Sequence, residues 1–206
     1  FSMDGHLAPV QELVSICEKY EAHLIIDEAH AIGVIGQEGE GLVQREGLQD
    51  RVFARVYTYG KAPGCHGAAI AGSERLKTYL VNFSRSFVFT TALPETAVRA
   101  IQGSYKIFPS LQEERDRIHA LVRQFRNASL PFEKLESETP VQGVVVPGNS
   151  AVKKVAAVLA DAGLDVRPIL YPSVPKEKER LRISLHAFNK AEELSRLLEV
   201  LAGTHA

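Results

Sequence analysis

Three polar residues in the first third of the chain have types and spacing that could support covalent chemistry. Asp27 and His30 end the apolar segment IIDEAH (25–30), and Lys61 lies further along in TYGKAPGCHGAAIAGS (58–73). A lysine amine can form a Schiff base with a carbonyl group, and a carboxylate can keep a nearby ring nitrogen protonated. The pattern therefore indicates imine chemistry assisted by an acid.

Each part of this pattern is ambiguous by itself. A lysine beside glycine is usually a solvated loop charge, and an Asp-x-x-His pair can cap a helix or supply two metal ligands. The order along the chain favours chemistry, because each set comes at the end of an apolar strand, where open α/β sheets hold their ligands. We therefore predict a site for pyridoxal 5′-phosphate, in which Lys61 binds the cofactor and Asp27 faces its pyridine nitrogen.

Hydrophobic periodicity predicts the elements that must position these residues. We expect helices at 10–20, 74–83, 95–128 with an interruption at Pro109, 150–163 and 189–203. We expect strands at 22–27, 52–59, 67–73, 87–95, 165–170 and 180–186, and short strands within 132–148. The alternation predicts an α/β fold with a mostly parallel sheet over residues 1–108, followed by a smaller α+β domain over 109–206.

Composition narrows the class of protein. The chain has 206 residues, of which 45% are hydrophobic and 24% are charged, and its net charge is −1. That charge argues against nucleic acid or an anionic membrane as a partner, and no apolar run approaches the ~20 residues needed to span a bilayer. Cys17 and Cys65 form no CxxC pattern, so we expect neither a metal site nor a disulfide framework. We expect a soluble, cytoplasmic protein.

Five segments resemble, in the same order, the motifs of the α-oxoamine synthases, a family of fold-type I pyridoxal-phosphate enzymes. They are FSMDG, IIDEAHAIGVIG, TYGKAPGCHGAAIAGS, FVFTTALPE and RLRISLHAFN. The family condenses an amino acid with an acyl-CoA or acyl carrier protein thioester and releases carbon dioxide. The combination of GCHGAA with FTTALP is most similar to the 8-amino-7-oxononanoate synthases of biotin biosynthesis, which implies L-alanine and a pimeloyl thioester as substrates. The family's polypeptide is longer and carries a further phosphate loop, so we expect these residues alone to be inactive.

The resemblance implies a role for each matching position in the cofactor site. Lys61 would carry the cofactor and act as the catalytic base, Asp27 would face the pyridine nitrogen, and His30 would hydrogen-bond the phenolic oxygen. Ser2 would also contact the cofactor, and Thr58 would donate to its phosphate.

Other matching positions concern the substrate and the partner subunit. Arg182 would bind the substrate carboxylate, and Ser173 would lie beside the substrate. Thr91 would reach the phosphate of the neighbouring subunit in a homodimer with shared active sites. Leu170 departs from the pattern, because some members carry a second arginine there.

Three alternatives remain open from the residues. One is the 2-amino-3-ketobutyrate CoA ligase reaction of glycine with acetyl-CoA, and another is a non-catalytic module that only binds pyridoxal phosphate. The third, a metal-dependent hydrolase using Asp27 and His30, lacks a third ligand at suitable spacing.

Overall fold

A computed structural model describes residues 1–204, which form two compact units. The N-terminal unit is Pro9–Gln112, and the C-terminal unit combines Phe1–Ala8 with the chain from Glu113 onward. The predicted boundary after residue 108 lies close to this division, but the contacts group residues 1–8 with the second unit. The assignment of the two parts as a cofactor-binding domain and a small domain stays a prediction.

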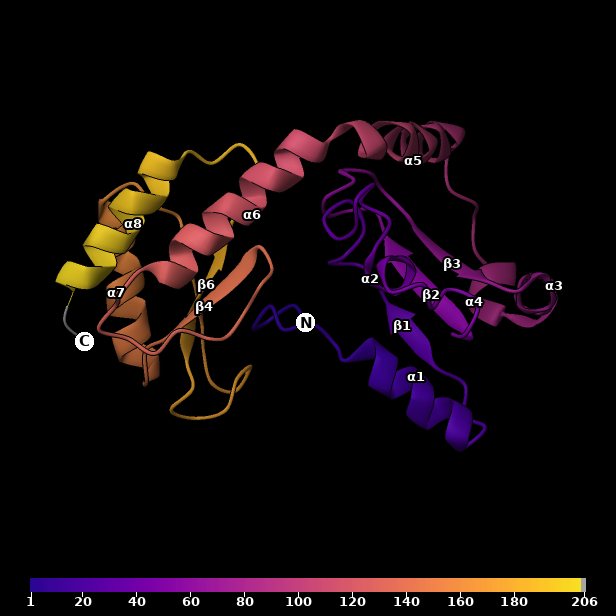
Figure 1. Ribbon diagram of the computed structural model, residues 1–206, viewed down its shortest axis with the longest axis horizontal. Helices are drawn as coiled ribbons and strands as arrows, with labels where there is room; N and C mark the ends of the chain where they lie inside the picture. The colour runs from indigo at the N-terminus through magenta and orange to yellow at the C-terminus, as the bar shows by residue number, and fades with distance from the viewer. Residues whose placement is uncertain (205–206) are drawn as a thin grey trace. The chain divides into compact units, whose positions relative to one another are not determined.

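The N-terminal unit contains a three-stranded sheet together with helices (Figure 1). Its elements are α1 (Val10–Lys19), β1 (Ile25–Asp27), α2 (Leu42–Arg45), β2 (Ala54–Thr58), β3 (Ala68–Gly72), α3 (Glu74–Phe83), α4 (Arg85–Val88), α5 (Glu95–Ile107) and the 3-10 turn η1 (Phe108–Ser110). The predicted helices at 10–20 and 74–83 are confirmed, and the three predicted strands are present with shorter bounds.

The strand order is β1-β2-β3, and the two pairings differ in direction. β1 and β2 are parallel, with Asp27 opposite Val56, whereas β2 and β3 are antiparallel, with Thr58 opposite Ala68. The reason is the length of the connections, because a parallel pair needs a crossover of about a dozen residues or more and the short link at 59–67 can only reverse the chain. The carboxyl ends of β1 and β2, which are parallel, therefore lie at the same edge of the sheet.

The predicted strand at 87–95 is wrong. Residues Arg85–Val88 form the single helical turn α4, and the following residues up to Pro94 are irregular. The amide of Val88 donates to Ser84 at 2.8 Å and that of Phe89 to Arg85 at 3.1 Å, so these two amides are satisfied within the turn and not by a partner strand. The apolar residues that suggested a strand are exposed, as at Phe89.

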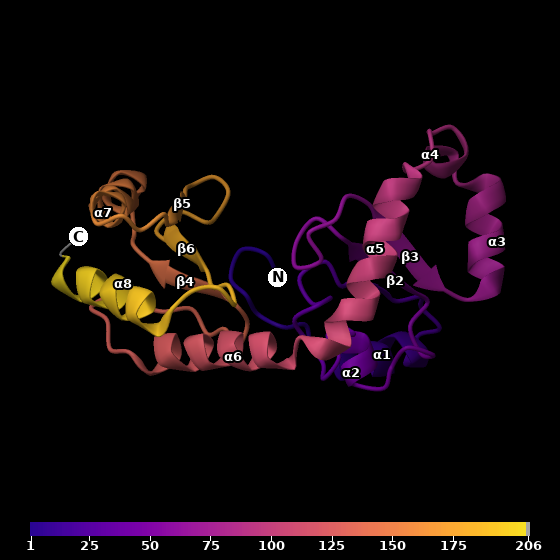
Figure 2. The ribbon, with the colours of Figure 1, turned by 90° about the horizontal axis from the view of Figure 1, so that it is seen from above.

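The C-terminal unit is an antiparallel sheet with helices (Figure 2). It contains α6 (Gln112–Asn127), β4 (Val141–Val145), α7 (Asn149–Asp161), β5 (Arg167–Ile169), β6 (Arg180–Ser184) and α8 (Ala191–Gly203), with strand order β4-β6-β5. The predicted interruption at Pro109 is confirmed by η1, which separates α5 from α6 because proline cannot donate to the helical ladder.

One face of this second sheet carries the core. Leu181 and Ile183 of β6 are buried among residues of α6, α7 and α8, including Phe125, which is fully buried. Since side chains alternate along a strand, Arg180 and Arg182 belong to the opposite face. No helix within residues 1–204 has the length and apolar character needed to cross a membrane.

Candidate active site

The predicted cofactor residues of the N-terminal unit lie at the ends of the parallel strands. Asp27 is the last residue of β1 and Thr58 the last of β2. Lys61 follows in the link to β3, and its Nζ donates to Thr58 Oγ1 at 3.2 Å. The structure therefore brings the lysine and the threonine into direct contact and puts the aspartate on the adjoining strand.

The carboxylate of Asp27 is oriented by its own backbone. The amide of Ala29 donates to Asp27 Oδ1 at 2.8 Å, while Oδ2 has no hydrogen-bond partner within residues 1–204. Asp27 and Lys61 are exposed, and His30 and Thr58 are half-buried. An open carboxylate oxygen, an accessible amine and a neighbouring hydroxyl are the groups that a pyridinium, an aldehyde carbon and a phosphate require.

Glu28, between Asp27 and His30, is a positioning residue that the sequence motif did not reveal. It is 1% exposed, and its two oxygens accept from the amides of Leu42 at 2.9 Å and Val43 at 2.7 Å. These are orphan donors at the start of α2, which has no side-chain cap of its own. Glu28 thereby attaches the end of the glycine-rich segment 33–41 to the strand that carries Asp27. The available signal in the sequence was an acidic residue, Glu28, ahead of the glycine-rich segment 33–41.

Helix α5 holds the link that carries Lys61. Ser104 Oγ donates to the Pro63 carbonyl at 3.2 Å and lies 3.1 Å from Cys65 Sγ. The hydroxyls of Tyr59 and Tyr105 are 3.1 Å apart, and burial, with the hydrogen bond to Tyr105, raises the pKa of Tyr59 well above its usual range. Tyr59 is thus a neutral, structural phenol. Cys65 is a packing residue in the contact between α5 and the link that carries Lys61.

The predicted substrate residues lie in the C-terminal unit. Arg182 on β6 is half-buried; its Nε donates to the Ser2 carbonyl at 2.7 Å and its Nη1 to Ser184 Oγ at 2.9 Å. Ser2 therefore meets Arg182 through its backbone. Gly5 continues the contact, because its carbonyl accepts from Ser137 Oγ at 3.1 Å and Thr139 Oγ1 at 3.0 Å.

The remaining predicted residues have fewer contacts. Ser173 is exposed in the turn after β5, where its amide donates to the Leu170 carbonyl at 2.8 Å. Leu170 packs against the core of the unit, and as an apolar side chain it provides no charge at the position where some family members carry an arginine. Thr91 is exposed in the irregular segment between α4 and α5. The roles of these residues stay predictions.

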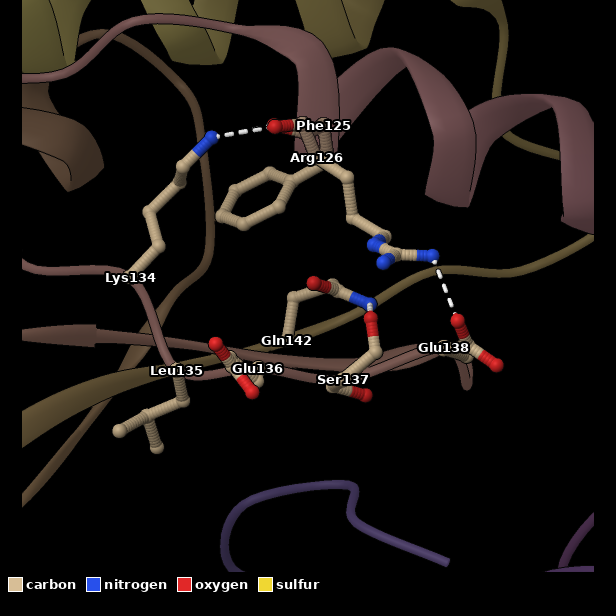
Figure 3. A pocket seen from close by; sticks show the side chains of 8 residues that line it. All are labelled: Phe125, Arg126, Lys134, Leu135, Glu136, Ser137, Glu138 and Gln142. Atoms are coloured by element: carbon tan, nitrogen blue, oxygen red, sulfur yellow. Dashed lines mark hydrogen bonds and ion pairs between the residues drawn. The ribbon is translucent and has the colours of Figure 1, made fainter.

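A pocket of about 440 Å³ in the C-terminal unit contains none of the predicted residues (Figure 3). Lys134 is one of the residues that line this pocket. The Nζ of Lys134 donates to the carbonyls of Phe125 at 3.2 Å and Arg126 at 2.6 Å near the end of α6. Burial, with the charge of Arg126, lowers the pKa of Lys134. These contacts are those of a cation that caps a helix C-terminus, so Lys134 has a structural explanation. Within residues 1–204 no group of three acidic, histidine or cysteine side chains could hold a metal ion.

The sequence matches known proteins over nearly its whole length. The family model described as Aminotransferase class I and II matches residues 1–201. The chain is 38% identical to an 8-amino-7-oxononanoate synthase of Marinobacter nauticus over 98% of its own length and 52% of that protein. It is 38% identical to one of Methylobacillus flagellatus, over 98% of this chain and 51% of the other. It thus spans about half the length of these relatives.

Solved structures agree with this match. Serine palmitoyltransferase of Sphingomonas wittichii superposes with a TM-score of 0.89 and 25% identity, over 98% of this chain and 52% of the other. The 8-amino-7-oxononanoate synthase of Francisella tularensis gives a TM-score of 0.83 and 25% identity, over 98% and 59%. The predicted fold class, an α/β fold-type I enzyme, is confirmed by these superpositions.

Proposed function

Since the chain belongs to the class I and II aminotransferase family, we propose that it acts as a pyridoxal-phosphate-dependent acyltransferase. It condenses an amino acid with an acyl thioester and releases carbon dioxide. The observation that carries the proposal is the contact of Lys61 Nζ with Thr58 Oγ1, at 3.2 Å, at the sheet edge where Asp27 also ends its strand.

The cofactor would be held by groups that this edge supplies. Pyridoxal phosphate, when bound, delocalises the electron pair left at the amino acid's α-carbon. The Oδ2 of Asp27 would face the pyridine nitrogen and keep it protonated, while Oδ1 stays fixed by the Ala29 amide. Thr58 donates its hydroxyl to the phosphate, and His30 hydrogen-bonds the phenolic oxygen. Ser2 adds a further contact to the cofactor.

Lys61 has two tasks in this proposal. Its Nζ would hold the cofactor, and as a free amine it would take the proton from the amino acid's α-carbon and later return one. Because the amine lies on an exposed link fixed by the α5 contacts, it can leave and return without unfolding the strand. Thr58 accepts from it in the structure and so keeps it near the site.

Arg182 binds the amino acid's carboxylate. A guanidinium is permanently charged and its N–H donors have fixed directions, so it can position the carboxylate of the substrate. Ser173 lies beside the substrate, and Thr91 donates to the phosphate of the second subunit in a homodimer. The protein works in the cytoplasm.

For the substrates, we propose L-alanine and a pimeloyl thioester, which give 8-amino-7-oxononanoate. The support is that relatives at 36–39% identity carry that name. The 2-amino-3-ketobutyrate ligase reaction is the rival within the family. A panel of alanine, glycine and serine against long and short acyl thioesters separates the two. Turnover only with glycine and acetyl-CoA would reject our substrate assignment.

The cofactor assignment is tested by borohydride reduction of the protein, expressed with any sequence that its gene encodes on either side and mixed with pyridoxal phosphate. Peptide mass mapping should find a phosphopyridoxyl adduct on Lys61. Lys77, an exposed lysine on α3, serves as the control for non-specific labelling. Lys61→Arg should abolish both the adduct and turnover. A folded wild type without an adduct on Lys61 would instead support the non-catalytic module.

A further inference from the structure

The register of the second sheet puts two arginines directly opposite each other. Arg167 on β5 pairs with Arg182 on β6. In an antiparallel pair, residues directly opposite each other project from the same face with Cβ atoms about 5 Å apart. Arg167 therefore projects from the same face as Arg182, the residue proposed to bind the substrate carboxylate. No sequence motif singled it out, because the pairing depends on the register of two strands.

The charges of this pair are weakly compensated. Arg167 Nη2 contacts Asp165 Oδ2 at 3.0 Å, but both side chains are more than three-quarters exposed, and such surface pairs contribute little. Arg182 has only neutral partners within residues 1–204, the Ser2 carbonyl and Ser184 Oγ. Like charges directly opposite on a sheet repel, so an anion between the two guanidiniums would stabilise this face.

The other side of Arg182 offers no polar group. Its neighbour on β4 is Gly143, and the space beside that glycine is filled by the side chain of Leu135. Leu170, just after the end of β5, also packs against the core. Arg167 is therefore the charged group in the neighbouring strands that can join Arg182 in binding an anion.

We propose that Arg167 and Arg182 bind one carboxylate together, that of the amino acid substrate. The inference rests on the proposed function and adds Arg167 as a substrate-binding residue. Arg182, held at Nε and Nη1, keeps Nη2 free for an end-on contact to one oxygen. Arg167, whose ion-pair partner Asp165 is solvent-exposed, can swing from that carboxylate to the other oxygen. Two guanidiniums then fix the plane of the carboxylate more strictly than one.

The test compares Arg167→Gln and Arg167→Lys with wild type, all loaded with pyridoxal phosphate. The control is Arg126→Gln, because Arg126 also makes an ion pair with a carboxylate in the same unit, that of Glu138 at 3.0 Å. Calorimetry measures L-alanine binding without thioester, and steady-state kinetics give KM for both substrates. Arg167→Gln should weaken L-alanine binding about tenfold, as expected for lost charge-assisted hydrogen bonds, and leave the thioester KM unchanged.

The variants distinguish binding from a structural role. Arg167→Lys keeps the charge but not the fork, so its L-alanine affinity should be intermediate. The melting temperature of Arg167→Gln should not fall, because the change removes a repulsion and only an exposed ion pair. Unchanged L-alanine binding, a rise confined to the thioester KM, or a loss of binding that tracks a lower melting temperature would each overturn the proposal. A wild type without the Lys61 adduct would reject the proposed function instead.

Discussion

Arg182 Nε donates to the carbonyl of Ser2 at 2.7 Å, which joins residues 180 positions apart in the chain. The proposed carboxylate-binding guanidinium therefore also holds the FSMDG segment against the sheet. Ser137 and Thr139 hold the same segment at Gly5. One side chain thus links the conformation of the first residues to the proposed substrate site.

Arg182→Gln should disturb both functions of this side chain. L-alanine affinity should fall tenfold or more because charge-assisted hydrogen bonds are lost. The amides of Gly5 and His6, which donate to Phe1 and Asp4 within the segment, should exchange deuterium faster. Hydrogen exchange and calorimetry measure the two effects, with Arg126→Gln as control. Exchange at the wild-type rate would show that the Ser2 contact does not hold the segment.

Gly5→Ala tests how tightly the segment is packed. Gly5 has φ +78°, and a Cβ there would overlap the Val141 carbonyl and the hydroxyl of Ser137. Gly163, with φ +79° and open space around it, is a matched control for the backbone cost alone. Both variants should lose about 1–2 kcal/mol for a left-handed alanine, and Gly5→Ala a further ~1–3 kcal/mol for overlap. Equal losses in urea unfolding would mean that the contact relaxes freely.

Thr58→Val removes the hydroxyl that contacts Lys61 while keeping the shape of the side chain. If Thr58 donates to the cofactor's phosphate, the dissociation constant of pyridoxal phosphate should rise severalfold, up to about tenfold. Thr58→Ser, which restores the hydroxyl, should bind like wild type. Absorbance titration gives the constants. Identical affinity in the valine and serine variants would remove Thr58 from the phosphate site.

Local signals explain how much of the fold could be predicted. The helix predicted at 74–83 matches α3, because Ser73 caps it by accepting from the Leu76 amide at 3.2 Å. The helix predicted at 150–163 lies close to α7, Asn149–Asp161, and Gly163 follows with the positive φ of a helix stop. The strand predicted at 87–95 is wrong, because a short apolar run also fits a helical turn followed by an exposed loop.

Relationships between distant residues could not be predicted in the same way. The positions of Asp27, Thr58 and Lys61 followed from strand ends, which periodicity locates. The pairing of Arg167 with Arg182 depends on register, which one residue of slippage would change. The packing of residues 1–8 on the second unit depends on hydrogen bonds to backbone carbonyls, for which the sequence has no pattern.

Glu28→Gln tests the buried carboxylate beside the site. The change replaces one acceptor by an amide donor that faces the backbone N–H groups of Leu42 and Val43. The loss of one charge-assisted bond should lower the free energy of unfolding by about 1.5–3 kcal/mol. The exposed Glu12→Gln should stay within about 0.5 kcal/mol of wild type. Urea unfolding measures both, and a Glu28 variant as stable as the control would show that water replaces the contact.

The last prediction concerns acid. Glu179 is buried, and its Oε2 accepts from the Gly148 amide at 2.9 Å, which lowers the pKa of the carboxyl below its usual 4.5. The unfolded chain therefore takes up the proton first as the pH falls, and the stability that Glu179 contributes is present above pH 4.5 and is lost as the pH drops through the folded-state pKa.

Glu179→Gln should accordingly melt at a lower temperature than wild type at pH 7, and the difference should shrink as the pH falls below 4.5. Glu192→Gln, an exposed change in the first turn of α8, corrects for the general effect of removing a carboxylate. Calorimetric melting between pH 3 and pH 7 measures the difference. A gap that stays constant over this range would mean that the Gly148 contact does not depend on the charge of Glu179, and that its stabilising effect comes from packing.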